Sequence, residues 1–477
     1  MSQFSTYLKE LISSHGESIA SLSRTLGIER TSIHKALTDE RTLSYKSVQT
    51  LAQHFDLTID ERQEFFRLYD TRLQGEEAYE NRQAVCDLLN TLAAINFTMP
   101  SPPEVSSVPV TDQLIRGEYA VHSLIRSVLI YETSHSALSD TEFELLVPEK
   151  LNLTMELMEL WLNGRNFVVN ELLCLKSGRR SGSPARKNLQ KLSSIIPLCL
   201  ASRGNYKPYS FKKSAQTYAM SPLNYYIITP NYLILMSEDL NTAQITNNRE
   251  LISCYLNFFH TLIQNCDLWV QCSSNILEVL QEYITKTDND SLQVLMSQPC
   301  PGRYITPEII KKYMCSADMP YNPMFRLVEK HFSTLRNISQ NYLTIFSEEG
   351  LNTLVKTCIL QDLPPQYVPP LDPSDIKLML TSLYNETLQG TVTSLIVRPN
   401  IVQIPEYLTV YATPSSGLHF YTTNSFIFGA YCCDIHISDN TLCRIFSDFF
   451  HGLSGSPMVY SMEDTLHILK QYISRLP

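Results

Sequence analysis

Polar and basic side chains gather on one face of a short helix predicted at residues 29–37, with the sequence ERTSIHKAL. Ile33 and Leu37 are one helical turn apart and mark the buried face. The opposite face carries a guanidinium, an imidazole, an ammonium and two hydroxyl groups, on Arg30, Thr31, Ser32, His34 and Lys35. A guanidinium can bond a guanine edge or a phosphate, hydroxyl and imidazole groups can reach base edges, and an ammonium more readily meets a phosphate. The pattern therefore favours recognition of duplex DNA through the major groove.

Two further helix starts flank this segment. Ser18 stands before a predicted helix IASLSRTL, and Ser44 stands before YKSVQTLAQHF, so each serine can cap a helix. The free backbone N–H groups at a helix start can bind phosphates, and Lys46 adds a positive charge to the second start. We therefore expect Ser18, Ser44 and Lys46 to join the DNA interface.

Amphipathic helices must position these side chains, and residues 1–72 have the apolar spacing of five such helices. Gly16 follows the first helix, where a left-handed residue commonly ends a helix. Gly27 falls in the tight turn between the second and third helices, where the backbone needs a positive φ that glycine adopts freely. Ile28 follows as an apolar residue that closes the turn.

The run from Leu8 to Glu61 resembles the helix-turn-helix domain of phage-repressor-type (XRE family) regulators, over roughly an eighth of the chain. The resemblance rests on apolar spacing, the turn glycine and loop lengths, at Leu22, Ser23, Leu26, Gly27, Ile28, Ile33, Val48, Leu51, Ala52, Phe55 and Leu57. Three positions depart from the family pattern: Ser23 replaces an alanine, Ser18 stands where a glutamine often contacts phosphate, and Glu29 replaces a serine cap. The resemblance implies a DNA-binding domain whose third helix reads the bases. The residues alone also allow a helical bundle that contacts only proteins.

Charge is unevenly distributed along the chain. The formal net charge is −10, and residues 1–72 hold nine basic and ten acidic side chains, so tight non-specific binding to DNA is not expected. Useful affinity would therefore need a homodimer. The interval 172–237 contains no acidic residue and ten basic ones: Lys176, Arg179, Arg180, Arg186, Lys187, Lys191, Arg203, Lys207, Lys212 and Lys213. Its Gly, Ser and Pro content favours a solvated loop, but it could also attract an anionic ligand or DNA phosphates.

The rest of the chain carries no motif for catalysis or cofactor binding. It has no phosphate-binding glycine loop, no dinucleotide fingerprint, no H-E-x-x-H and no G-x-S-x-G, so we predict no catalytic residue, no cofactor and no enzymatic activity. A cluster of potential metal ligands fits no zinc spacing, and no metal site is predicted from Cys432, Cys433, Asp434, His436 and Cys443. The twelve cysteines are irregularly spaced, and we expect them to be reduced and mostly buried.

The predicted organisation is a helix-turn-helix domain at 1–72, a connecting helix at 73–97, a Pro/Ser linker at 98–112 and two α/β lobes at 113–295 and 296–477. The connecting helix has apolar residues at helical spacing. It either pairs with its copy in a dimer or packs on its own chain.

The two lobes are predicted from an internal repeat with a period of about 190 residues, too long for a solenoid. Residues 225–236 resemble 419–429, residues 244–263 resemble 436–454, and residues 276–286 resemble 465–475. In the second pair Asn248 matches Asn440, and both segments end in Phe-Phe-His, at His260 and His451. These histidines could line a cleft between the lobes, but packing is the more common role of such residues.

The expected fold is therefore an all-α N-terminal helix-turn-helix domain followed by a large α/β (α+β) body with an internal duplication. We expect a sequence-specific DNA-binding transcriptional regulator whose body dimerises, senses a small-molecule or peptide effector, or does both. A protein-interaction scaffold with a helical adaptor domain and, less favoured, an enzyme fused to a helix-turn-helix are the alternatives. We expect a cytoplasmic protein with no membrane partner, because the sequence has neither a secretory signal pattern nor an apolar run of about 18 residues.

Overall fold

The structure is a computed structural model of the chain. It describes residues 1–98, 110–135, 141–175, 183–212, 223–275, 278–279, 281, 284, 291–314, 323–338, 342–363, 368–413, 417–422, 433–454 and 456–477. Most of the predicted Pro/Ser linker therefore lies outside the described residues. In the part of the chain that is described, no helix is both long enough and apolar enough to cross a membrane.

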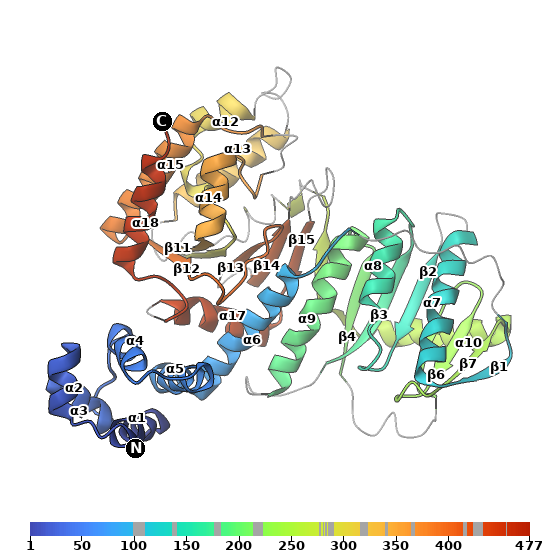
Figure 1. The fold of residues 1–477 in the computed structure, drawn as a ribbon. Coiled ribbons are helices and arrows are strands. Elements are labelled where there is room, and N and C mark those ends of the chain that lie inside the picture. Colours follow the sequence, from blue (N-terminus) through green and yellow to red (C-terminus); the bar gives the residue numbers. More distant parts are fainter. Residues whose placement is uncertain are drawn as a thin grey trace.

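Five helices form the N-terminal head, which spans residues 1–74 (Figure 1). They are α1 (Gln3–Ser14), α2 (Ile19–Leu26), α3 (Arg30–Leu37), α4 (Tyr45–His54) and α5 (Ile59–Gln74). Their inner faces make an apolar core of their own, in which Leu22, Ile33 and Leu51 are fully buried. Gly16 and Gly27 have φ values of +65° and +67°, as the turn positions require.

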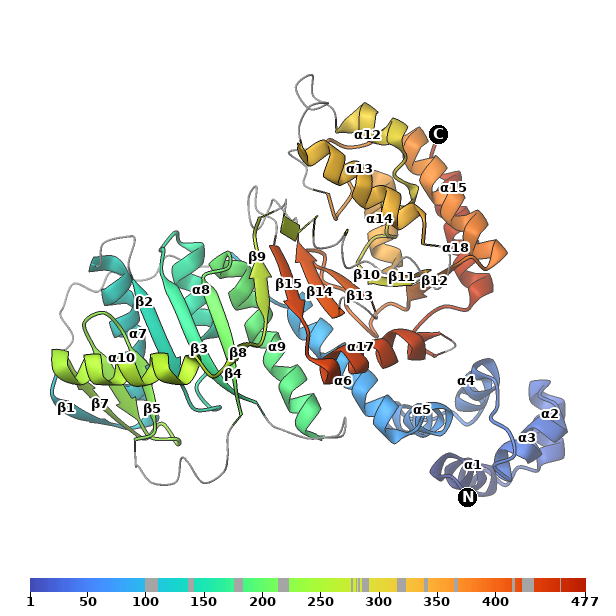
Figure 2. The same ribbon diagram turned by 180° about the vertical axis from the view of Figure 1, so that it is seen from behind.

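The first lobe is built on a mixed sheet whose strand order is β1-β7-β6-β5-β2-β3-β4-β8. Its strands are β1 (Gln113–Arg116), β2 (Glu142–Leu146), β3 (Val168–Leu175), β4 (Tyr206–Lys212), β5 (Tyr225–Ile228), β6 (Leu233–Met236), β7 (Thr242–Thr246) and β8 (Asp267–Leu268). Strands β2, β3 and β4 are parallel, and the remaining pairings are antiparallel. The helices are α7 (Glu118–His135), α8 (Thr154–Leu162), α9 (Ser183–Ser202) and α10 (Arg249–Ile263). Figures 1 and 2 show α10 on the opposite face of the sheet from α7, α8 and α9.

The second lobe is built on a sheet with the order β12-β11-β10-β13-β14-β15-β9. Its strands are β9 (Gln271–Ser273), β10 (Leu292–Leu295), β11 (Tyr342–Ser347), β12 (Val392–Val397), β13 (Thr409–Thr413), β14 (Gly417–Thr422) and β15 (Cys433–Ile437). Its helices are the short η1 (Gly302–Tyr304), α12 (Pro307–Tyr313), α13 (Pro323–Arg336), α14 (Glu348–Thr357), α15 (Pro373–Gln389), α17 (Asn440–Leu453) and α18 (Met462–Ser474).

The two sheets have the same topology. From β1 to β4 the first sheet runs β1-β7-β6-β5-β2-β3-β4, and the second runs β9-β15-β14-β13-β10-β11-β12, so the strands correspond in chain order. In both, three parallel strands are followed by three antiparallel ones. A multidomain fold with a helical N-terminal region and a duplicated α/β body is therefore confirmed.

The sheet order corrects two details of the predicted repeat; a third is corrected below. The match of 225–236 with 419–429 pairs β5 with β14, whereas the sheet order makes β13 the counterpart of β5. Short apolar strands resemble one another in sequence. Shifting the alignment of the two lobes by one whole strand therefore still matches apolar residues with apolar residues. The second lobe also begins before residue 296, because β9 and β10 already pair within the second sheet.

Helix α6 (Glu76–Ala93) connects the head to the body and packs against α9 and α17. Val85, Leu89 and Leu92 on its apolar face are fully buried in the core that both lobes share. The Tyr407 hydroxyl donates a hydrogen bond to the Leu92 carbonyl at 2.7 Å. Of the two predicted alternatives, these contacts support packing of the connecting helix on its own chain, because the chain's own body covers that face.

Candidate functional site

The face of α3 predicted to read DNA is open to solvent. Arg30, Thr31, His34 and Lys35 are exposed, whereas Ile33 on the inner face is fully buried. A left-handed Gly27 turns the chain between α2 and α3, and the buried Ile28 packs into the head core just before α3 begins. The structure thus places four of the predicted residues on one surface.

Ser32 and Glu29 differ from the other residues of α3. Ser32 is only half-exposed, and its hydroxyl lies 3.4 Å from the Glu29 carboxylate, to which it donates a hydrogen bond. Glu29 occupies the N-cap position without making a side-chain cap. Its exposed negative charge lies at the start of the helix, so a phosphate would be repelled there.

The two predicted serines are already engaged as helix caps. The Ser18 hydroxyl accepts a hydrogen bond from the Ser21 backbone at 3.1 Å, and the Ser44 hydroxyl accepts one from the Ser47 backbone at 3.2 Å. Each therefore shapes its helix start with its side chain. Lys46, in the first turn of α4, has a side chain that is exposed to solvent.

Sequence reasoning missed a polar contact beside the start of α2. His54 Nε2 lies 3.1 Å from Glu17 Oε1. Hydrogen bonds from Ser21 and His54 lower the pKa of Glu17, so its carboxylate stays ionised. The pair ties the C-terminal end of α4 to the start of α2. Glu17 precedes α2 and His54 ends α4, so the two residues are 37 positions apart in the sequence and no local pattern predicts their contact.

A second network that the sequence did not reveal holds the C-terminal end of α3. Asp39 follows α3 with φ +63°, and the Ser2 and Ser5 hydroxyls each donate to its carboxylate at 2.5 Å. These hydrogen bonds lower the pKa of Asp39 to about 2. Arg72 of α5 donates to the Asp39 carbonyl at 2.7 Å. The network therefore fixes α3 against both α1 and α5.

A buried ion pair joins the head to the body. Arg82 of α6 donates to Asp70 of α5 at 3.1 Å, and both side chains are less than one tenth exposed. The other terminal nitrogen of Arg82 donates to Gln74 at 2.6 Å, and Gln74 in turn donates to the Gly452 carbonyl at the end of α17 at 2.9 Å. The head, α6 and the second lobe thus meet at one polar junction.

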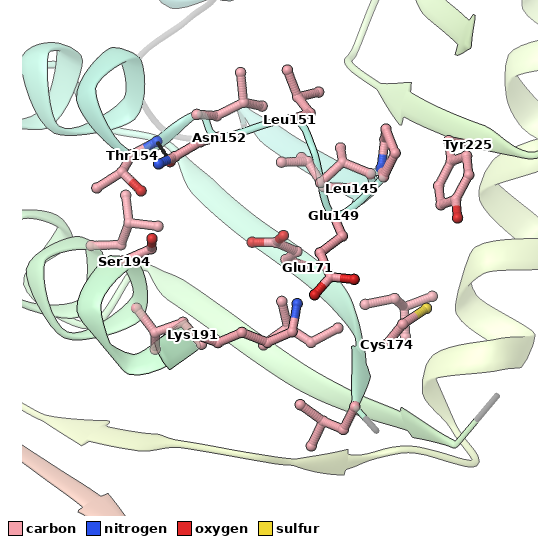
Figure 3. A pocket seen from close by; sticks show the side chains of 18 of the residues that line it. Leu145, Glu149, Leu151, Asn152, Thr154, Glu171, Cys174, Lys191, Ser194 and Tyr225 are labelled. Atoms are coloured by element: carbon pink, nitrogen blue, oxygen red, sulfur yellow. Dashed lines mark hydrogen bonds between the residues drawn. The ribbon is translucent and has the colours of Figure 1, made fainter. Parts of the chain in front are cut away.

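The first lobe contains a cavity of about 760 Å³ at the carboxyl ends of β2 and β3. Ligands of open α/β sheets commonly bind at this edge. The floor is apolar, while acidic and basic side chains line the walls: Glu149, Glu171, Glu238, Lys187 and Lys191. Figure 3 shows Lys191 extending from α9 toward Glu149 and Glu171.

Glu171 is the distinctive group of this cavity. Burial raises its pKa, although a hydrogen bond and the charge of Lys191 oppose that effect. The Tyr206 hydroxyl donates the hydrogen bond to Glu171 at 2.5 Å. A carboxyl held in this way can receive a cationic group of a ligand.

A second cavity, of about 690 Å³, lies at the equivalent edge of the second lobe. Residues that follow or end β10, β11 and β12 line it, together with Ala93 and Ile95 at the C-terminal end of α6. Both lobes therefore carry a cavity beyond their parallel strands, and both cavities lie close to elements that contact α6.

The basic interval is only partly described. Lys176, Arg179, Arg180 and Lys213 lie outside the described residues. Arg186 of α9 lies 2.5 Å from Glu80 of α6 and so links the cavity helix to the connecting helix.

The two repeated histidines do not share a cleft. Both are exposed at the ends of α10 and α17, and each contacts the first parallel strand of its own lobe. His260 lies 3.7 Å from Glu144 of β2, and His451 lies 3.3 Å from Gln293 of β10.

The described members of the predicted cysteine and histidine cluster, Cys433, Asp434, His436 and Cys443, lie on β15 and the start of α17, where they pack within the fold. His419 lies 3.0 Å from Asp434 and stacks on His436, all within the sheet. Over the described ranges, no three His, Cys, Asp or Glu side chains are arranged to hold a metal ion. Cys432 lies outside those ranges.

No protein-family model matches the chain, and none of the curated proteins matches its sequence. Three solved structures are similar at a low level. An archaeal chromatin protein, TrmBL2, described as having a novel mode of DNA binding, is 13% identical with a TM-score of 0.24, over 56% of this chain and 94% of that one. Phosphatidylserine synthase from Haemophilus influenzae is 9% identical with a TM-score of 0.24, over 83% and 98%. Polyphosphate kinase from Porphyromonas gingivalis is 11% identical with a TM-score of 0.21, over 76% and 55%. Similarity at this level assigns the chain to no family.

Proposed function

We propose that this chain is a cytoplasmic, sequence-specific DNA-binding transcriptional regulator of the XRE type, without enzymatic activity, that acts as a homodimer. The observation that carries the proposal is the α3 surface, where Arg30, Thr31, His34 and Lys35 are exposed together on the second helix of a helix-turn-helix. A short helix with this composition fits the major groove and can contact base edges.

The charges around α3 favour selective rather than general binding. Lys35 and Lys46 supply positive charge, while Glu17 and Glu29 place carboxylates beside the starts of α2 and α3. Attraction to phosphates is therefore modest, and the affinity must come from base contacts and from the two heads that one dimer carries.

The test is selection of bound duplexes from a random DNA library by the full-length chain at moderate salt. We expect enrichment of one short motif per head. Replacing Arg30 and His34 together by alanine is expected to weaken binding to that motif by about 1–3 kcal/mol for each base that the side chains no longer reach. Lys9→Ala, an exposed charge on α1, is the matched control and should leave the motif and its affinity unchanged. A folded protein that enriches no motif contradicts the proposal.

We also propose that the first-lobe cavity binds the effector, and that the effector is zwitterionic, such as a free amino acid or a short peptide. Glu171 and Glu149 suit an ammonium, Lys187 and Lys191 suit a carboxylate, and the apolar floor accepts a side chain. The signal has a direct route, because α9 lines the cavity and packs on α6, which is anchored to the head through Arg82.

Thermal unfolding of the full chain with each standard free amino acid, and with its N-acetylated and its amidated form, tests the effector site. We expect at least one free amino acid to raise the Tm, and both blocked forms of it to be weaker. Glu171→Gln and Lys191→Met should each remove the shift, whereas Lys207→Met on the exposed face of β4 should not. Equal shifts with free and blocked forms, or in the Glu171 variant, contradict the zwitterion assignment.

A further inference from the structure

The duplicated helices α10 and α17 can be aligned residue by residue. Asn248 and Asp439 each cap their helix by accepting hydrogen bonds from the second and third backbone N–H groups that follow. This places Asn248 opposite Asp439 and corrects the predicted match with Asn440 by one residue. Leu251, Cys254 and Phe258 then correspond to Leu442, Ile445 and Phe449.

In the second lobe this three-residue stripe is entirely covered. Leu442, Ile445 and Phe449 are each at most 1% exposed. Helix α17 lies between its own sheet and α6, and it also contacts α9. The same helix face in this fold is therefore a surface on which another helix packs.

In the first lobe the same stripe is open. Leu251 is 38% exposed and Phe258 is 53% exposed, and Cys254 between them is also exposed. Ile252 and Phe259 on the inner side pack on the sheet, so α10 is held in place without the stripe. Among the described residues no helix takes the place of α6 on this face, because α6 itself is packed on α17.

We propose that a second copy of this chain covers the stripe, with the two α10 helices antiparallel about a two-fold axis that passes midway between the levels of Cys254 and Tyr255. In that arrangement Leu251 of each chain packs on the partner's Phe258, because the two residues lie at equal distances along the helix from the axis. An isologous contact of this kind closes on itself and gives a dimer. The proposal rests on the homodimer of the proposed function and names its surface.

Sedimentation of the full-length chain without DNA tests the surface independently of DNA binding. We expect a species of about twice 54.5 kDa. Phe258→Glu should weaken this dimer by about a hundredfold in Kd, because two carboxylates would be placed in an apolar contact. Leu378→Glu, at a residue 60% exposed on α15, is the matched control and should leave the dimer intact.

Cysteine cross-linking gives a second readout that does not depend on a destabilised variant. Mild oxidation of the wild-type dimer is expected to give a disulfide-linked dimer through Cys254, and Cys254→Ser should lose it while remaining dimeric. A monomer at all concentrations, a dimer that Phe258→Glu leaves unchanged, or a cross-link that survives in Cys254→Ser overturns the proposal. DNA binding by α3 is tested by a separate selection experiment. A negative result for the α10 surface would therefore not by itself contradict the proposed DNA-binding function.

Discussion

Replacing Arg82 by leucine is expected to lower the free energy of unfolding of the head-to-body junction by about 3–5 kcal/mol. The side chains of Arg82 and Asp70 are 3% and 8% exposed, so the substitution leaves a carboxylate buried without its cation. The hydrogen bond from Arg82 to Gln74 disappears with it. Thermal unfolding of the full chain should therefore show the head melting earlier than the body.

The pH dependence of this variant identifies the cause. Burial already raises the pKa of Asp70 to about 6, against the pull of Arg82, and without Arg82 it must rise further. A raised carboxyl pKa means that the folded state takes up the proton more readily than the unfolded state, so stability is gained as the pH falls below the folded pKa. The loss of stability in Arg82→Leu should therefore shrink between pH 8 and pH 5.

The matched control is the double variant Asp70→Leu with Arg82→Leu. Removing both charges leaves an apolar pair, which costs far less than removing one partner. We expect it to recover most of the missing stability and to lack the extra pH dependence of Arg82→Leu over this range. If the double variant is as unstable as Arg82→Leu, the buried charge is not the cause and the ion pair is not what holds the junction.

Gly350→Ala is expected to destabilise the second lobe by about 3 kcal/mol or more. Gly350 is in the first turn of α14, where alanine normally stabilises a helix. Here a Cβ atom at residue 350 would lie 1.8 Å from the Ser297 carbonyl oxygen and 2.2 Å from its carbon. Both are backbone atoms of the loop after β10, and the Ser347 backbone N–H also donates to that carbonyl at 3.1 Å. The loop cannot move away without breaking this hydrogen bond.

Urea unfolding of the full chain measures the effect of Gly350→Ala. Thr353→Ala, an exposed position one turn further along α14, is the control and should change stability by no more than about 0.5 kcal/mol. The head should keep its own transition in both variants, since its core is separate from that of the lobe. Equal stability of the two variants would show that the loop adapts.

Local patterns in the sequence predicted the head well. Apolar spacing, serine caps and the turn glycines specify α1 to α5, and the same spacing places Arg30 and His34 on the outer face of α3. The networks that fix this face were not predictable, because Asp39 meets Ser2, Ser5 and Arg72 only after the chain has folded.

The sequence predicted the α/β class of the body and its duplication, but not which strands of the two lobes correspond. Sequence comparison matched β5 to β14, because buried strands of the two lobes share the same apolar composition. The cavity was missed for a related reason: Glu149, Glu171 and Lys191 come from different elements, and their approach depends on sheet order. The surface on which α6 packs was equally unpredictable, because the apolar spacing of a helix does not specify its packing partner.

The head and α10 lie at opposite ends of the molecule (Figures 1 and 2). Two chains joined through α10 would therefore carry their α3 helices at the two far ends of an elongated particle, and the heads would not sit on adjacent turns of one duplex. Such a particle is suited to hold two separate DNA segments at a set span. Duplex DNA is stiff over about 150 base pairs, so two sites on one molecule would have to be far enough apart for the DNA between them to bend into a loop. The regulator would then control genes by looping DNA between two sites rather than by occupying a single promoter sequence.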